Sequence, residues 1–349
     1  MKLSGQILIL MLLSISLTTL GKPVFSPGSN PDGTGAELHT VSFDTVLMGS
    51  AFILTAVHES DTTAWEAIRA GINEIIRIES LISSWDEQSE TSEINRQAGV
   101  EPVAVSEELF QLIKRSLKVS DLSDGYFDIS FASAERFWKF DKRSIDRPDE
   151  ASVRATVRKV GYENIELNEE RKTVFLKEAG MRIGFGAIGK GYAANRVRAI
   201  MKEAGIQSGV VNAGGDLLAW GRRPDGKVWT IGVANPDEIY EVKAWLDLTD
   251  MAVVTSGNYE KYVMIDGVRY GHIIDPKTGW PAQGLTSVTL VCPDAELADA
   301  LATTVFVLGL EGGLDLVNQL RGIEAILIDD QGSLHYSTGI KERILLNGN

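Results

Sequence analysis

Asp299 and Thr303 carry oxygen atoms at a spacing that could bind a metal ion. The segment from Ala295 to Leu308 is rich in Ala and Leu and lacks Gly and Pro, so it predicts a helix. Residues four apart share one helix face, and a carboxylate with a hydroxyl on that face suits Mg2+. A local alternative is open: Asp299 caps a neighbouring backbone, and Thr303 bonds the carbonyl four residues before it. Taken alone, the pair favours this local interpretation.

Three Gly-rich stretches each follow an apolar segment that predicts a strand, and they span residues 184–192, 212–216 and 255–260. Small residues let a backbone approach a ligand closely, and the first stretch opens a predicted helix whose free N–H groups could hold a phosphate. Lys190 adds a positive charge there. The spacings match neither a Walker loop nor a dinucleotide fingerprint, and each stretch could equally be a tight turn. Their shared position after strands favours a common ligand crevice.

His272 is one of only four histidines and lies shortly before Asp275 and Pro276. A histidine with a pKa near neutrality can take a proton from a hydroxyl or orient a phosphate. The alternative is a half-buried histidine at a strand end, followed by an ordinary type I turn at residues 275–279.

Composition excludes some classes of protein. The chain has 349 residues, 44% of them hydrophobic and 23% charged, as in a soluble globular protein. A formal net charge of −14 argues against nucleic acid as the partner. Cys292 is the only cysteine, so the chain forms no internal disulfide, and we expect this residue to be a small buried hydrophobe.

Residues 1–21 predict a signal peptide or an N-terminal anchor. Lys2 precedes an apolar run from Ile7 to Leu13 that continues to Leu20, which is short for a membrane span. We therefore expect an exported protein, in the periplasm or on the outer face of the inner membrane, attached to it if the segment is not cleaved. Residues 22–39 predict a flexible tether rich in Pro, Gly and Ser. Residues 40–349 then form one folded domain.

Runs of short strands joined by tight turns, with a few helices between them, predict an α+β fold with largely antiparallel sheets and helices packed against them. Helices are expected from Ala64 to Ile82, with Asp61 as the N-cap, and at 107–121, 189–204, 295–308 and 312–320. Strands are expected at 41–47, 51–57, 165–167, 173–176, 181–185, 210–211, 217–220, 228–233, 242–248, 252–255, 261–265, 286–291 and 325–328.

Taken together, these stretches resemble the ApbE-like family, the FAD:protein FMN transferases. The matching segments keep the family's order from Val41 to Gly309, at 48–50, 83–85, 92–95, 125–129, 186–193, 212–216, 256–260, 272–276 and 298–303. The resemblance implies a T-fold-like α+β protein that binds FAD and Mg2+, cleaves the pyrophosphate and transfers FMN to a Thr or Ser hydroxyl, with release of AMP. The implied acceptor is a flavoprotein domain of an extracytoplasmic or membrane redox complex.

The resemblance also assigns residues. The implied Mg2+ ligands are the Ala187 carbonyl, Asp299 and Thr303, and His272 is the candidate that activates the acceptor hydroxyl or stabilises the transferred phosphate. The positions that match the family's FAD contacts are Met48, Trp85, Tyr126, Phe127, Asp128, Lys190 and Ile274.

Gly184 departs from the family pattern, because many relatives carry there an Asp that helps to hold FAD. Two other functions stay open at this point. With water as the acceptor, the same fold would be an FAD pyrophosphatase that gives free FMN and AMP. A non-catalytic periplasmic protein that stores or delivers FAD would need no metal ligands.

Overall fold

The computed structural model describes residues 37–141, 143–234, 242–259, 261–340 and 344–346. The predicted signal segment and residues 22–36 of the predicted tether lie outside the described residues. The first strand, β1, begins at His39, at the boundary between the predicted tether and the predicted domain.

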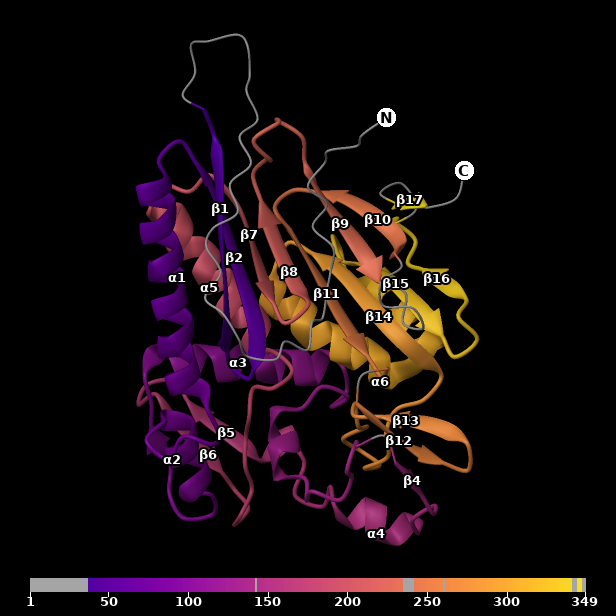
Figure 1. Cartoon of the computed structure of the whole chain (residues 1–349). Coiled ribbons are helices and arrows are strands. Elements are labelled where there is room, and N and C mark those ends of the chain that lie inside the picture. Colours follow the sequence, from indigo (N-terminus) through magenta and orange to yellow (C-terminus); the bar gives the residue numbers. More distant parts are fainter. Residues whose placement is uncertain (1–36, 142, 235–241, 260, 341–343, 347–349) are drawn as a thin grey trace.

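An antiparallel sheet of eight strands forms the centre of the fold (Figure 1). Its order is β1 (His39–Leu47), β2 (Ser50–His58), β7 (Ser208–Ala213), β8 (Asp216–Trp220), β11 (Met251–Gly257), β14 (Leu285–Cys292), β15 (Glu324–Asp329) and β16 (Leu334–Tyr336). Every neighbouring pair in this sheet is antiparallel. The central strands β8 and β14 are buried along almost their whole length, as expected for a sheet covered on both faces.

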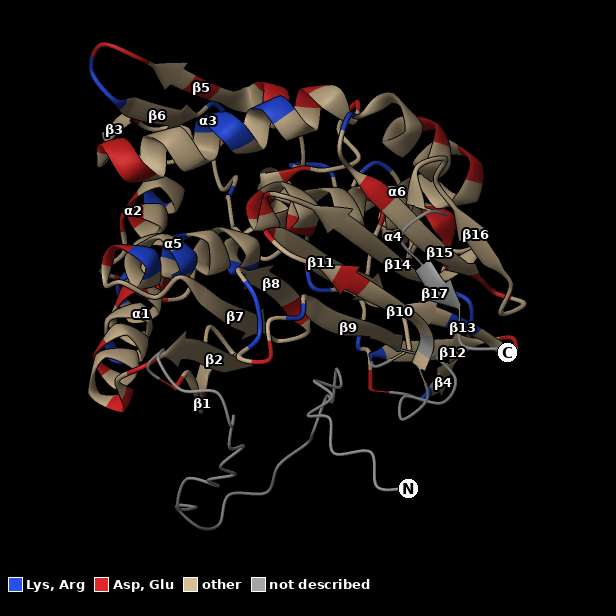
Figure 2. Ribbon diagram, turned by 90° about the horizontal axis from the view of Figure 1, so that it is seen from above, with Lys and Arg blue, Asp and Glu red and all other residues tan. Residues whose placement is uncertain are grey.

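Three helices cover one face of the sheet: α1 (Asp61–Ile82), α5 (Gly189–Glu203) and α6 (Ala295–Gln319). Figure 2 shows them side by side along that face. Apolar residues at three- and four-residue spacing, such as Ile68, Ile75 and Ile78 of α1, point into the main core. Each such buried side chain stabilises the fold by about 1.5–3 kcal/mol relative to an exposed one. The helix starts therefore have fixed positions relative to the strand ends.

A small antiparallel sheet covers the other face (Figure 2). It comprises β9 (Trp229–Ala234), β10 (Val242–Leu248) and β17 (Ile344–Leu346). Ile231 and Leu246 from this sheet join Leu217 and Val253 from the central sheet in a second apolar cluster.

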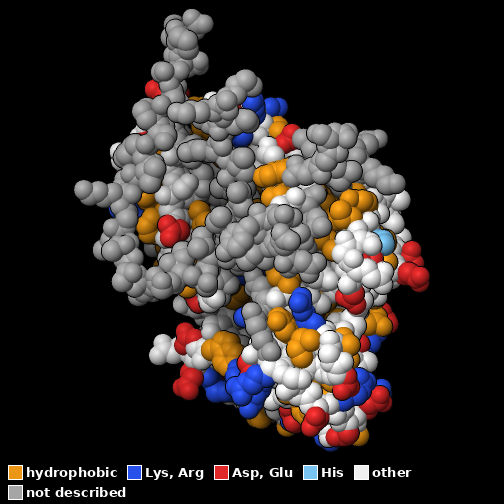
Figure 3. Space-filling model, turned by 45° about the vertical axis from the view of Figure 1, so that its right-hand side comes forward, with side chains coloured by type: hydrophobic (Ala, Val, Ile, Leu, Met, Phe, Trp, Pro, Cys, Tyr) orange, Lys and Arg blue, Asp and Glu red, His pale blue; other side chains and the backbone are white. Residues whose placement is uncertain are grey.

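The remaining elements lie below the central sheet in Figure 1. They are α2 (Glu90–Arg96), β3 (Val103–Ala104), α3 (Glu107–Leu122), a 3-10 turn η1 (Ile129–Ser133), β4 (Ser144–Ile145), α4 (Glu150–Ala155), a 3-10 turn η2 (Tyr162–Asn164), β5 (Ile165–Asn168), β6 (Thr173–Leu176), β12 (Tyr262–Ile265) and β13 (Val268–Gly271). Figure 3 shows Lys and Arg side chains beside hydrophobic ones at this lower end.

The predicted α+β fold class is confirmed, whereas its likeness to the T-fold stays a prediction. The predicted N-cap of α1 is wrong: Ser60, and not Asp61, accepts the hydrogen bond from the Thr63 N–H. The two helices predicted at 295–308 and 312–320 are confirmed: they are the two segments of α6, which meet at a non-helical kink at Gly309, where φ is 74°.

No strand forms at 181–185, although Met181, Ile183 and Phe185 are buried. The backbone of Ile183 bonds instead to the Asn95 side-chain amide, through its N–H at 2.7 Å and its carbonyl at 3.0 Å. Apolar alternation therefore marks an extended segment here and not a sheet ladder.

Within the described part of the chain, α6 alone is long and apolar enough to cross a membrane by length and composition. It packs on β11 and β14, with Leu301, Val305 and Phe306 fully buried. Its apolar composition is that of a core helix.

Candidate functional site

The start of α5 meets the first turns of α6 at Asp299. This carboxyl group is only 4% exposed, and its Oδ2 accepts a hydrogen bond from the Gly191 N–H at 2.9 Å. In a regular helix that N–H would bond the carbonyl four residues earlier, which is the carbonyl of Ala187. Among the described residues, the Ala187 carbonyl accepts no hydrogen bond. Asp299 therefore takes the donor that would otherwise occupy the Ala187 oxygen.

Gly191 permits this contact because the two helices nearly touch. A Cβ atom at position 191 would lie 2.1 Å from the Ala295 carbonyl oxygen and 2.8 Å from the Asp299 Cβ. Real Cβ atoms do not approach backbone that closely, so only glycine fits without moving a helix.

Thr303 lies one helical turn beyond Asp299, as predicted, and its hydroxyl is 3.4 Å from that of Ser256 at the end of β11. A carboxylate, a hydroxyl and an unused carbonyl are hard oxygen donors of the kind that Mg2+ prefers. Across the described ranges, no group of three His, Cys, Asp or Glu side chains could hold a metal ion. The three predicted ligands include only one such side chain, Asp299. Their oxygen atoms fit an Mg2+ ion whose coordination is completed by substrate oxygens and water.

Asp216 is the neighbour that sequence reasoning missed. It begins β8, is 2% exposed and forms an ion pair with Lys190. Burial raises the pKa of Asp216, the Lys190 ammonium opposes that rise, and the nearby Asp299 carboxylate adds to it. The turn at 212–216 was recognised from its glycines. The Asp216 carboxylate pairs with Lys190, the side chain that is predicted to contact a phosphate.

His272 directly follows β13 and is exposed at the surface, with the Phe140 ring centroid 6.4 Å from its own. Crowding by protein atoms lowers the pKa of His272, and the ammonium groups of Lys261 and Lys190 lower it further. Lys190 is therefore close enough to His272 and to Asp216 to act electrostatically on both. A lowered pKa favours the neutral imidazole, which is the form that can accept a proton.

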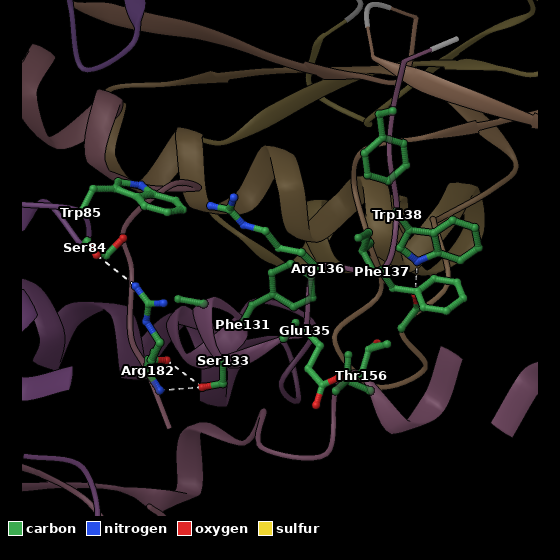
Figure 4. Close-up of a pocket in the computed structure, with 16 residues that line it drawn as sticks. Ser84, Trp85, Phe131, Ser133, Glu135, Arg136, Phe137, Trp138, Thr156 and Arg182 are labelled. Atoms are coloured by element: carbon green, nitrogen blue, oxygen red, sulfur yellow. Dashed lines mark hydrogen bonds between the residues drawn. The ribbon is translucent and has the colours of Figure 1, made fainter. Parts of the chain in front are cut away.

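A pocket of about 500 Å3 opens beside this region (Figure 4). Trp85 and Ile274, two of the predicted FAD contacts, both line it. Trp85 is 72% exposed, so its ring is available to a planar ligand. The sequence did not mark Arg136 and Arg182, which also line the pocket.

The remaining predicted FAD contacts have different surroundings; they are Met48, Tyr126, Phe127 and Asp128. Met48 has a positive φ of 49° and its methyl group would be 3.4 Å from a Cβ at Gly189. The Tyr126 ring lies 4.1 Å from the Lys277 ammonium. Phe127 is 3% exposed, so its side chain belongs to the core.

Both oxygens of Asp128 hold backbone. Its Oδ1 accepts from the Ser130 N–H at 2.7 Å and its Oδ2 from the Tyr162 N–H at 2.9 Å. Burial raises the pKa of this carboxyl, and the hydrogen bonds oppose that rise. Asp128 therefore fixes the segment that carries Tyr126 and Phe127.

Comparisons with known proteins show the family of this chain. The ApbE family model matches residues 48–327, and the chain belongs to this family. A relative from Klebsiella pneumoniae, named FAD:protein FMN transferase, is 33% identical over 290 residues, which cover 82% of this chain and 88% of that protein. A protein of the same name from Treponema pallidum is 33% identical, over 79% of this chain and 82% of its own length.

Solved structures give the same family. The ApbE protein of Thermotoga maritima superimposes with a TM-score of 0.79 at 30% identity, over 87% of this chain and 99% of that one. The flavinyl transferase ApbE of Pseudomonas stutzeri, in its apo form, gives 0.77 at 26% identity, over 88% and 97%.

Proposed function

We propose that this protein is a transferase that moves FMN from FAD to a Thr or Ser hydroxyl of an acceptor flavoprotein, with Mg2+ as cofactor and AMP as the leaving group. The observation that carries the proposal is the junction of α5 and α6, where Asp299 bonds Gly191 and leaves the Ala187 carbonyl unused. The names of the relatives support the transfer of FMN from FAD to protein.

Ala187, Asp299 and Thr303 would hold the Mg2+ ion through oxygen atoms. A bound Mg2+ ion neutralises charge on a pyrophosphate and makes its phosphorus more open to attack by an oxygen. Lys190, oriented by Asp216, places a positive charge near the same phosphate oxygens.

His272 accepts the proton of the acceptor hydroxyl. The hydroxyl oxygen then bonds the phosphorus of the FMN half, and the bond from that phosphorus to the bridging oxygen breaks. AMP departs with that oxygen and its electron pair. The lowered pKa of His272 supports this role, since an unprotonated imidazole is the form that acts as a base.

The test is to incubate the protein with FAD, Mg2+ and a flavoprotein domain that carries an acceptor hydroxyl. Covalent FMN on the acceptor, with an equal amount of AMP, is the expected result. Free FMN with an unlabelled acceptor would identify an FAD pyrophosphatase. Bound FAD without AMP release would identify a storage or delivery protein.

We also propose that the protein works outside the cytoplasm, in the periplasm or on the outer face of the inner membrane. The apolar run from Ile7 to Leu20 after Lys2 supports this location. Protease added to spheroplasts should digest the protein, while a cytoplasmic marker stays intact. Protection of both would contradict export.

A further inference from the structure

Two guanidinium groups lie beside Trp85 in the pocket (Figure 4). The Arg136 Cζ is 4.4 Å from the indole centroid and the Arg182 Cζ is 6.0 Å from it. Both arginines line the pocket. Two positive charges at one pocket are notable in a chain whose net charge is −14. They favour an electron-rich or anionic ligand.

The two arginines differ in how they are held. Arg182 is fixed: its Nη2 donates to the Ser84 carbonyl at 3.0 Å, and its backbone N–H donates to the Ser133 hydroxyl at 2.7 Å. The exposed guanidinium of Arg136 makes no hydrogen bond or ion pair with the described residues, and its contact is with the indole face. Arg136 can therefore move away from Trp85 at little cost.

Gly184 contributes no side chain to this part of the pocket. A Cβ at this position would point toward two residues that line the pocket, at 3.1 Å from the Ala132 Cβ and 3.6 Å from the Ser84 hydroxyl oxygen. Neither guanidinium forms an ion pair within the described ranges, although the acidic side chain of Glu135 also lines the pocket.

We propose that Trp85 and Arg136 close on opposite faces of a planar ring of FAD, so that Arg136 determines nucleotide affinity in this chain. The inference rests on the proposed function, in which FAD is the substrate. To admit the ring, Arg136 moves outward by about 3.5 Å, one aromatic contact distance. Arg182 stays bonded to the Ser84 carbonyl and thereby positions the neighbouring Trp85. A guanidinium stacks on such rings through both its charge and its plane.

The test is calorimetric titration of FAD into the full-length protein and three variants. Arg136→Ala should raise the Kd for FAD about 2- to 30-fold, the range expected for a cation on an aromatic ring. Arg136→Lys keeps the charge and loses the planar group, so its Kd should lie between the two. Arg69→Ala removes an exposed arginine on α1 and should bind as the wild type does.

Titration of FMN and AMP separately identifies the ring, since the variant should weaken binding of the half that enters the pocket. A wild-type Kd in Arg136→Ala for FAD, FMN and AMP alike would overturn the inference and leave the proposed function intact. A wild-type protein that does not bind FAD would contradict both.

Discussion

Substitution of Gly191 by alanine should disrupt the junction on which the proposed metal site depends. The added Cβ would lie 2.1 Å from the Ala295 carbonyl oxygen, a backbone atom that can yield only if α6 moves. Overpacking of this kind costs about 1–3 kcal/mol. If the helices separate, the hydrogen bond from the Gly191 N–H to the Asp299 carboxylate is also lost, for about 1.5–3 kcal/mol. We expect a total loss of about 2.5–6 kcal/mol in the free energy of unfolding.

The assay is urea unfolding followed by far-ultraviolet circular dichroism, with Gly186→Ala as the matched control. Gly186 belongs to the same Gly-rich stretch, is exposed, and has no atom within 4 Å of its added Cβ. Its substitution should change stability by less than about 1 kcal/mol. Equal unfolding midpoints for Gly191→Ala and Gly186→Ala would refute the account of helix contact at Asp299.

Three further predictions concern single side chains. Asp216→Asn removes the charge that holds Lys190 and should lower the kcat of FMN transfer about 10- to 100-fold. Circular dichroism checks that the variant is folded, and an unchanged kcat would show that Lys190 needs no such partner. Because the pKa of His272 is lowered, its neutral form persists to more acidic pH than that of an ordinary histidine. The value of kcat/KM should therefore stay level from pH 8 to about 6.5 and fall only in more acidic buffer. A fall of kcat/KM with its midpoint above pH 7 would contradict the role of His272 as the base. Cys292 is 2% exposed and burial raises the pKa of its thiol to about 11, so iodoacetamide should label it only after unfolding, and rapid labelling of the native protein would contradict its placement in the core.

Local sequence patterns predicted most helices, because a helix depends mainly on residues that lie close together in the sequence. The apolar spacing from Ala64 to Ile82 reports which face of α1 meets the core. The break at Gly309 was also visible, since glycine ended the Ala- and Leu-rich run and lies at the kink of α6. By contrast, α2 (Glu90–Arg96) was missed because it is only seven residues long and has little apolar periodicity.

The pairing of Asp299 with Gly191 could not be read from the sequence, because 108 positions separate the two residues. The family resemblance named the predicted ligands but not the contact between them. That contact forms because the fold packs the start of α5 against α6. For the same reason Asp216 and Lys190 were noticed in separate Gly-rich stretches and not as an ion pair. Arg136 and Arg182 carried no sequence signal at all, since single arginines between motifs are most often solvated.

The most direct test of the central claim is intact-mass spectrometry of the acceptor after reaction with FAD and Mg2+. The comparison is between the wild type, Asp299→Ala and Asp315→Ala, the last being an exposed aspartate on the same helix. We predict that the wild type and Asp315→Ala add one FMN per acceptor and that Asp299→Ala, at any Mg2+ concentration within the assay, adds none. Labelling by Asp299→Ala at the wild-type rate would contradict the account.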